Sequence, residues 1–269
     1  MEYSVLILII CLLITLFSTA IGSSFVFFFR KNFGPKAKSI ILGFAGGIMV
    51  AAAFFGLILP SIEQSKANNT YLGWSFVPPV VGFILGGLLL FGLDKIIPHF
   101  HKMQNVEEGP KNNSLSKNLK FFLAVTIHNI PEGLAVGLAC GLAISLSGDA
   151  SIIAAMSALS LAIGIGIQNI PEGAAVSIPM YGDGMSRGKA FAFGAASGIV
   201  EPIFAGIAIF LAQLTIINPW LLSLAAGAMI YVTLDEILPE SREGGFNHFA
   251  MWSFMLGFVI MMVLEIVLS

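Results

Sequence analysis

Eight long apolar stretches constrain this 269-residue chain more than any other feature of its sequence. Each is close to, or longer than, the roughly 20 residues with which an α-helix crosses about 30 Å of hydrocarbon. They fall at residues 3–29, 38–61, 74–98, 120–146, 150–180, 188–213, 217–239 and 248–268. Only 10% of the residues are charged, whereas soluble domains carry about 25%. The sequence therefore predicts an all-α polytopic membrane protein with eight transmembrane helices, in one domain covering residues 1–269.

Positive charge is distributed unevenly between the predicted loops. Of the 13 Lys and Arg residues, only Lys66 lies on one side of the membrane. The others lie in or beside the loops that follow the odd-numbered spans: Arg30, Lys31, Lys36, Lys38, Lys95, Lys102, Lys111, Lys117, Lys120, Arg187, Lys189 and Arg242. Because cytoplasmic loops carry the excess of Lys and Arg, these loops are predicted to be cytoplasmic and both termini extracytoplasmic. The longest of them covers residues 99–119.

This charge pattern reports membrane topology and not a charged partner, since the net charge is only −2. We therefore expect a multi-pass protein of the cell membrane, with the lipid bilayer as its partner and no nucleic acid. The sequence leaves the oligomeric state open, and a homodimer is one arrangement compatible with it.

An unusual polar motif occurs twice inside the apolar stretches. Residues 128–133 read HNIPEG and residues 168–173 read QNIPEG. Counted from the cytoplasmic ends of their helices, Glu132 and Glu172 lie roughly 18 Å and 14 Å deep, and Glu201 in the next span lies roughly 18 Å deep. Each unpaired carboxylate there costs on the order of 2.5 to 3.5 kcal/mol. Three such residues in one layer are best explained by a shared cation.

The residues around these glutamates have the chemistry of metal ligands. Residues 128–132 place His, Asn and Glu on one helix face, and residues 168–172 repeat the pattern with Gln in place of His. The proline in each motif releases the carbonyl four residues earlier, at Ile127 and Ile167, because proline has no amide hydrogen. The glycine after each glutamate lets a neighbouring helix approach closely.

HNIPEG, QNIPEG and the SGIVEP of residues 197–202 together resemble the motifs of the ZIP (Zrt-, Irt-like) divalent-metal transporters. The resemblance covers nearly the whole chain. It implies a transporter domain that moves Zn²⁺ into the cytoplasm, with Fe²⁺, Mn²⁺, Co²⁺ or Cd²⁺ as further substrates and no organic cofactor. It also implies a midplane metal centre on helices 4, 5 and 6. By motif, the ligands of that centre are His128, Asn129, Glu132, Gln168, Asn169, Glu172 and Glu201.

Two positions depart from the commoner family pattern. Gln168 replaces a histidine, which resembles the prokaryotic GufA-like branch, and Asn169 stands where that branch often has Asp. Two dications would then face three glutamates and no fourth carboxylate. We therefore expect one high-affinity site and weak occupancy of a second.

An internal repeat also links the two halves of the chain. Residues 46–61 read GGIMVAAAFFGLILPS and residues 226–241 read AGAMIYVTLDEILPES. These helices are five spans apart and must run in opposite directions, as inverted repeats of secondary transporters do. Resemblance to the ZIP fold implies a 3+2+3 arrangement, with helices 1–3 and 6–8 as inverted triplets and helices 4 and 5 between them.

Further polar residues are candidates for the metal pathway. Glu63 lies at the outer end of helix 2, where it would attract cations to an entrance. Asp94, Asp235 and Glu236 lie nearer the cytoplasmic ends of helices 3 and 7, as interfacial charges or as ligands on a release path. His99 and His101 resemble the loop histidines of the family. The accessory candidates are Glu63, Asp94, His99, His101, Asp235 and Glu236.

Two other functional classes are compatible with some of these features. A passive divalent-metal channel would use the same ligands as a carrier. An intramembrane metalloenzyme would need two imidazoles and a general-base glutamate, as in HExxH, but His128 is the only histidine deep in a span. One imidazole with carboxylate and amide oxygens, and no thiolate, suits Zn²⁺ and similar dications better than Cu⁺.

Overall fold

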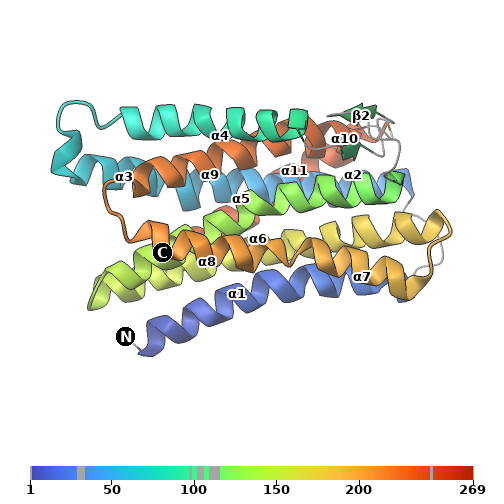
Figure 1. Ribbon diagram of the computed structural model, residues 1–269, viewed down its shortest axis with the longest axis horizontal. Helices are drawn as coiled ribbons and strands as arrows, with labels where there is room; N and C mark the ends of the chain where they lie inside the picture. Colours follow the sequence, from blue (N-terminus) through green and yellow to red (C-terminus); the bar gives the residue numbers. More distant parts are fainter. Residues whose placement is uncertain are drawn as a thin grey trace.

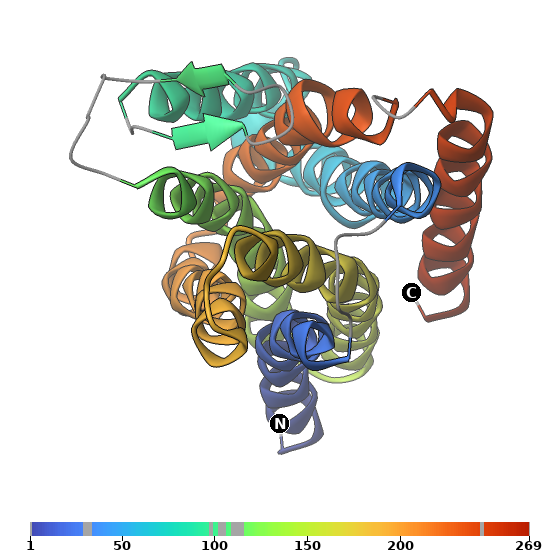
Figure 2. The same cartoon turned by 90° about the vertical axis from the view of Figure 1, so that its right-hand side faces the viewer.

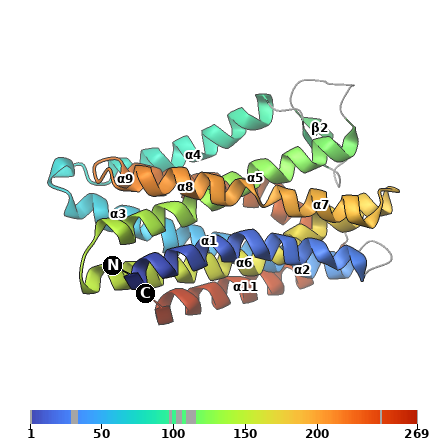
Figure 3. The same ribbon diagram turned by 60° about the horizontal axis from the view of Figure 1, so that its bottom comes forward.

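The structure, a computed structural model, describes residues 2–28, 34–96, 99–101, 106–108, 116–242 and 245–268. Within these residues, eight helical segments are long and apolar enough to cross a membrane. They run side by side along the long axis of the molecule, and the two ends of the chain lie at the same end of the bundle (Figures 1 and 3). The predicted all-α polytopic class with eight spans is therefore confirmed.

Several spans are made of more than one helical segment. The first four spans are α1 (Glu2–Ser23) with the 3₁₀ turn η1 (Ser24–Phe27); α2 (Pro35–Ala51), η2 (Ala52–Ile58) and α3 (Leu59–Ala67); α4 (Val77–Ile96); and α5 (Lys117–Ser145). The last four are α6 (Asp149–Gly182); α7 (Arg187–Ser197) and α8 (Val200–Ala212); α9 (Asn218–Val232), η4 (Thr233–Ile237) and α10 (Leu238–Arg242); and α11 (Asn247–Leu268). A 3₁₀ turn, η3 (Asn69–Tyr71), follows α3.

A small hairpin lies between α4 and α5. Strands β1 (His99–His101) and β2 (Val106–Glu108) pair antiparallel, with His99 opposite Glu108. The remainder of the predicted 99–119 loop lies largely outside the described residues, as do the side chains of His99 and His101.

The two repeated helices share an irregularity as well as a sequence. Both η2 and η4 are π-helical, and each ends directly before a Leu-Pro pair, Leu59-Pro60 and Leu238-Pro239. Proline cannot bond the carbonyl four residues earlier, which in each case lies inside the π segment. Wide π turns frequently occur at functional sites. Here they interrupt the second and seventh spans at matching positions.

The helices form two bundles, which are seen in cross-section in Figure 2. The motif bundle contains α1, α5, α6 and α7–α8, in which α1 packs along α6 and α5 packs along α8. The flanking bundle contains α2–η2–α3, α4, α9–η4–α10 and α11, in which α2 packs along α11 and α4 along α9. The predicted inverted repeat exchanges span 1 with 6, span 2 with 7, span 3 with 8 and span 4 with 5. Under this exchange the α1–α6 pair becomes the α8–α5 pair, and the α2–α11 pair becomes the α9–α4 pair.

Glycine contacts support the inverted repeat at the level of single residues. A Cβ atom on Gly86 of α4 would lie 2.0 Å from the carbonyl oxygen of Leu224 in α9. Its counterpart on Gly257 of α11 would lie 2.2 Å from the carbonyl oxygen of Phe44 in α2. Small residues permit this closeness between membrane helices. The same contact thus occurs in both halves, in opposite orientations.

The Gly86→Ala substitution tests this packing. We expect it to lower the free energy of unfolding by about 1–3 kcal/mol, because the added methyl group must displace helix backbone. The matched control is Gly92→Ala on the same helix, where an added Cβ meets nothing within 4 Å. Thermal unfolding midpoints in detergent should fall for the first variant only; equal midpoints would show that the α4–α9 contact tolerates a side chain.

Candidate metal site

The two motif helices continue through their prolines. Helix α5 begins after Ser116, whose hydroxyl oxygen accepts a hydrogen bond from the Leu119 amide, and runs without a break past Pro131. Helix α6 likewise runs past Pro171. The two helices pack against each other within the motif bundle. Their polar faces are therefore brought together in the interior of the molecule, as the motif repeat predicts.

A cavity of about 100 Å³ lies where these polar faces meet the flanking bundle. Four predicted ligands line it: His128, Glu132, Gln168 and Glu172. Glu236 of η4 and Glu240 of α10 complete its polar lining, and Met49 is among its apolar residues. Leu42, Phe121 and Glu240 also line the cavity. It therefore extends toward the end of the bundle at which α5 begins and α10 ends.

Hydrogen bonds already pair some of the predicted ligands with each other. The Gln168 amide Nε2 donates to Glu132 Oε1. The imidazole Nε2 of His128 lies 3.1 Å from Glu236 Oε1, so the seventh span contributes a carboxylate to the histidine. Glu236 was predicted only as an accessory residue, either an interfacial charge or a ligand on a release path, and the structure places it beside His128.

The other three predicted ligands form a second polar group behind the cavity. Asn169 Nδ2 donates to Glu201 Oε2 at 2.8 Å, and Asn129 Nδ2 donates to the Ser197 carbonyl at 3.0 Å. None of Asn129, Asn169 and Glu201 is among the described residues that line the cavity, and their side chains are fully buried. The structure thus places the seven predicted ligands in a cavity group and a buried group, which are connected by the hydrogen bond from Gln168 Nε2 to Asn169 Oδ1 at 3.1 Å.

Glu201 owes its place to a break in the sixth span that the sequence did not predict. Helix α7 ends at Ser197 and α8 begins at Val200, so Glu201 lies in the first turn of a helix, where a negative charge is favourable. The α5 glycine after the motif, Gly133, packs against the backbone of Glu201. A Cβ on Gly133 would lie 2.4 Å from the Glu201 carbonyl oxygen.

Several oxygen atoms in these two groups are buried without a donor. Glu132 Oε2, Gln168 Oε1 and Asn129 Oδ1 have no hydrogen-bond partner in the described part of the chain. Buried polar atoms of this kind are uncommon and call for a specific explanation, such as an ion. Carboxylate and amide oxygens beside an imidazole form a donor set that suits Zn²⁺ and related dications.

The ligands are not arranged as a finished coordination shell. Among the described residues, no three His, Cys, Asp or Glu side chains are grouped so that they could hold a metal ion as they stand. Instead, Gln168 donates a hydrogen bond to Glu132, and Glu236 contacts His128. Binding of a cation at this site would have to replace those contacts with bonds to the metal.

The remaining accessory candidates have different locations. Asp94 is buried near the end of α4 and Asp235 is exposed on η4, and neither belongs to the described lining of the cavity. His99 and His101 lie on β1, and their side chains fall outside the described residues. Among the accessory candidates whose side chains are described, the structure brings Glu236 alone to the predicted ligands.

A second cavity, of about 330 Å³, lies toward the opposite end of the molecule. Glu63 and Gln64 of α3 line it, as does Glu265 of α11, whose exposed fraction is only 6%. Sequence reasoning missed Glu265, although a single glutamate within the apolar run 248–268 was a usable signal. We call this cavity the outer cavity and the first one the inner cavity, after the topology predicted from the Lys and Arg distribution. Glu63 and Glu265 make the lining of the outer cavity acidic.

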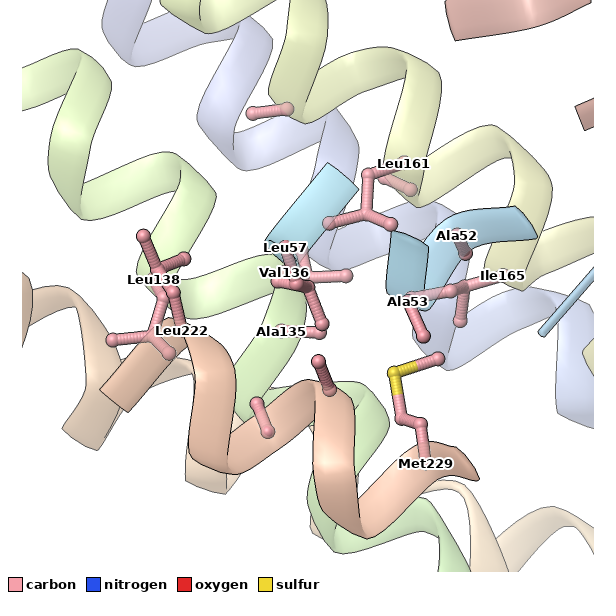
Figure 4. Close-up of a cluster of buried hydrophobic side chains, with 14 of the residues drawn as sticks. Ala52, Ala53, Leu57, Ala135, Val136, Leu138, Leu161, Ile165, Leu222 and Met229 are labelled. Atoms are coloured by element: carbon pink, nitrogen blue, oxygen red, sulfur yellow. The ribbon is translucent and has the colours of Figure 1, made fainter. Parts of the chain in front are cut away.

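An apolar layer separates the two cavities. Along α6, Ala154 and Ser157 line the outer cavity, Leu161 and Ile165 belong to the apolar cluster, and Gln168 lines the inner cavity. Figure 4 shows this cluster, in which Leu57, Val136, Leu222 and Met229 converge from η2, α5 and α9. The inner cavity is thus closed toward the chain termini by close-packed side chains from both bundles.

Comparison with known proteins identifies the family. A family model described as ZIP Zinc transporter matches residues 5–120 and 118–265. The chain belongs to the ZIP family. It is 32% identical to the human zinc transporter ZIP11, over 92% of this chain and 93% of the relative. It is 34% identical to the zinc transporter GufA of Myxococcus xanthus, over 87% and 88% of the two chains.

The ZIP membership confirms the resemblance inferred from the three motifs, including its bacterial GufA-like side. A zinc transporter ZupT of Streptococcus mutans is also 34% identical, over 91% of each chain. These relatives are named as transporters, so the metalloenzyme alternative is set aside and the protein is a multi-pass membrane transporter.

Proposed function

We propose that this ZIP protein carries Zn²⁺ into the cytoplasm through the inner cavity, where it is bound by His128, Glu132 and Glu172 with help from Gln168. The observation that carries the proposal is the set of buried oxygens without donors beside a single imidazole. Fe²⁺, Mn²⁺, Co²⁺ and Cd²⁺ accept the same ligands and are further substrates of the proposed site.

The proposed direction rests on topology. The inner cavity reaches the end of the bundle that carries Lys38, Lys120 and Arg242, and by the positive-inside rule that end faces the cytoplasm. The apolar cluster closes the path to the other side. The described conformation then corresponds to a transporter that is open to the cytoplasm and closed to the exterior.

A closed apolar layer between two cavities favours a carrier over a passive channel. A cation cannot cross a close-packed layer of Leu, Ile and Ala side chains at low cost. The two bundles must therefore rearrange at their interface before the site becomes accessible from outside. We assign the protein the alternating-access mechanism, in which the site faces one side at a time.

Uptake into proteoliposomes tests this function. We expect saturable ⁶⁵Zn²⁺ uptake that is stimulated by unlabelled Zn²⁺ on the opposite side of the membrane, with other dications competing. Liposomes without protein provide the background rate. Absence of Zn²⁺ uptake in folded protein would refute the proposed function, whereas single-channel currents without trans-stimulation would replace the carrier by the channel alternative.

The Glu63→Gln substitution tests the outer cavity as an entrance. Glu63 is exposed, so its charge is expected to raise the local cation concentration without binding tightly. Loss of this charge should raise the KM for Zn²⁺ by roughly 2- to 10-fold at low ionic strength and leave kcat unchanged. The rise in KM should be smaller in high salt, because salt screens the charge. A KM that is unaffected at every salt concentration would remove Glu63 from the pathway.

A further inference from the structure

The first helix has no polar motif, yet one of its side chains contacts the metal-site network. Thr19 of α1 is fully buried, and its hydroxyl donates to Glu201 Oε1 at 3.2 Å. Asn169 donates to the other carboxylate oxygen, Oε2, at 2.8 Å. Glu201 is thus held on both oxygens by donors from two different helices, α1 and α6.

The Glu201 carboxyl group is the nearer of two acceptors within reach of the Thr19 hydroxyl. The hydroxyl also lies 3.4 Å from the Thr15 carbonyl, but it has only one hydrogen to donate. The contact with Glu201 is the shorter of the two, so the carboxyl group is the main partner of the hydroxyl.

Close approach of three backbone segments places Thr19 at this point. A Cβ on Gly173 of α6 would lie 2.1 Å from the Thr19 carbonyl oxygen. A Cβ on Gly198, in the turn between α7 and α8, would lie 2.7 Å from the Thr19 Cβ and 2.8 Å from its hydroxyl. Glycine at both positions therefore allows Thr19 of α1 to pack against the turn between α7 and α8, which directly precedes Glu201.

The inverted repeat relates Thr19 to Glu201 directly. Gly133 of α5 packs on the backbone carbonyl of Glu201 in α8, and Gly173 of α6 packs on the backbone carbonyl of Thr19 in α1. The repeat exchanges α5 with α6 and the first span with the sixth. The contact of Gly173 with Thr19 therefore corresponds to the contact of Gly133 with Glu201, and Thr19 is the counterpart of Glu201 in the first half of the chain. The two counterparts meet, one as a hydrogen-bond donor and the other as a carboxylate.

We propose that Thr19 is a positioning residue of the metal site, which orients the Glu201 carboxylate from a helix outside the three ligand motifs. Glu201 is connected to the cavity, because Asn169 donates to Glu201 and accepts from Gln168 Nε2 at 3.1 Å, and the same Nε2 donates to Glu132. The proposal rests on the function proposed above, because the orientation of Glu201 acts through Asn169 and Gln168 on the residues that bind the transported dication. Loss of the hydroxyl leaves Glu201 Oε1 buried without that donor and free to turn. Binding of the metal should weaken, whereas movement between the two faces should continue.

The Thr19→Val substitution, which keeps the shape of the side chain, is the main test. We expect the KM for Zn²⁺ uptake to rise roughly 10-fold, as for other partners that orient ligands, with kcat largely retained. Thr19→Ser keeps the hydroxyl and should restore the wild-type KM. Thr15→Val is the matched control, because Thr15 is buried on the same helix and bonds only the Leu12 carbonyl through its hydroxyl, among the described residues.

Calorimetric titration of purified protein with Zn²⁺ or Cd²⁺ separates this proposal from the proposed function. Thr19→Val should weaken binding in the wild-type background but have no further effect in the Glu201→Gln background, because contacting residues are not additive. Thr19→Ala replaces the valine variant if the latter does not fold. Absence of transport by the wild-type protein would refute the proposed function and leave this binding measurement intact.

Three results would overturn the positioning role. The first is a wild-type KM and affinity in a folded Thr19→Val or Thr19→Ala protein. The second is a defect that serine does not restore, or that Thr15→Val reproduces, since either would indicate general packing of α1. The third is an equal loss of affinity with and without the Glu201 carboxylate.

Discussion

The Glu132→Gln and Glu172→Gln variants are each expected to lose zinc transport, with specific uptake reduced by on the order of 100-fold or more. Both residues line the inner cavity on neighbouring helices, and Glu132 carries a buried oxygen without a donor. Even residues that only orient metal ligands cost 10- to 100-fold on mutation, and direct ligands should cost at least as much. Glutamine keeps the size of the side chain and removes the charge.

Stability should respond in the opposite direction to transport. An uncompensated carboxylate inside a membrane protein is unfavourable, on the order of 2.5 to 3.5 kcal/mol on insertion scales. Replacing one of these carboxylates by an amide should leave the thermal unfolding midpoint of the metal-free protein equal to or higher than that of the wild type. Added Zn²⁺, which stabilises the wild-type protein by binding the folded state, should stabilise these variants much less.

The control for these variants is Asp149→Asn, an exposed acidic residue at the start of α6, the helix that carries Glu172. Its uptake and its stabilisation by Zn²⁺ should match those of the wild type. Wild-type uptake in a folded Glu132→Gln or Glu172→Gln protein would mean that the cavity is not the binding site.

The number and class of the spans could be predicted from the sequence because they depend on composition over long windows. A membrane helix needs about 20 apolar residues, and the chain supplies eight such runs. The convergence of residues 128–132 and 168–172 was also predictable. Residues four apart share a helix face, and antiparallel neighbours joined by a short loop bring such faces together.

The division of the site into a cavity group and a buried group could not be read from the sequence. It depends on the break between α7 and α8, where SGIV continues an apolar run without a strong stop signal. It also depends on rotation of α6, which turns Gln168 toward the cavity and Asn169 toward Glu201 although they are adjacent in sequence. Such rotations follow from close glycine contacts between helices distant in the chain.

Thr19 and Glu236 illustrate the same limit. A single threonine in an apolar helix is ordinary, and only the packing of α1 against α6 and the α7–α8 turn gives it a role. Glu236 lies in the π-helical segment η4, where the register differs from that of a regular α-helix, so its direction toward His128 could not be predicted from helical spacing.

Asn169→Asp is expected to create a second tight metal site behind the first. In the wild-type protein the Asn169 amide donates to Glu201 Oε2, so the two side chains need no cation between them. Aspartate replaces this donor with an acceptor and sets two carboxylates against each other. Like charges this close in a buried site cannot both remain ionised without a compensating cation. The buried group also contains Asn129 Oδ1, an oxygen without a donor in the described chain.

The charge of the two groups is counted separately, because Gln168, which joins them through hydrogen bonds to Glu132 and Asn169, is neutral. The cavity already holds the carboxylates of Glu132, Glu172, Glu236 and Glu240, of which Glu240 pairs with Lys38, whereas the buried group holds Glu201. Adding one carboxylate to the buried group brings it to −2, which matches one Zn²⁺ or Cd²⁺ there. The substitution should accordingly raise the number of tightly bound equivalents from one to two without changing the cavity site.

Calorimetry and anomalous diffraction from Cd²⁺ would count the bound ions, with Asn169→Ala as the matched control. Alanine also removes the donor but adds no charge, so it should still bind one tight equivalent. Transport by Asn169→Asp need not increase, because a carrier must release its ion and a tighter pair slows that step. One equivalent in every variant, or two equally tight equivalents in the wild type, would show that the charge at residue 169 does not control the second site.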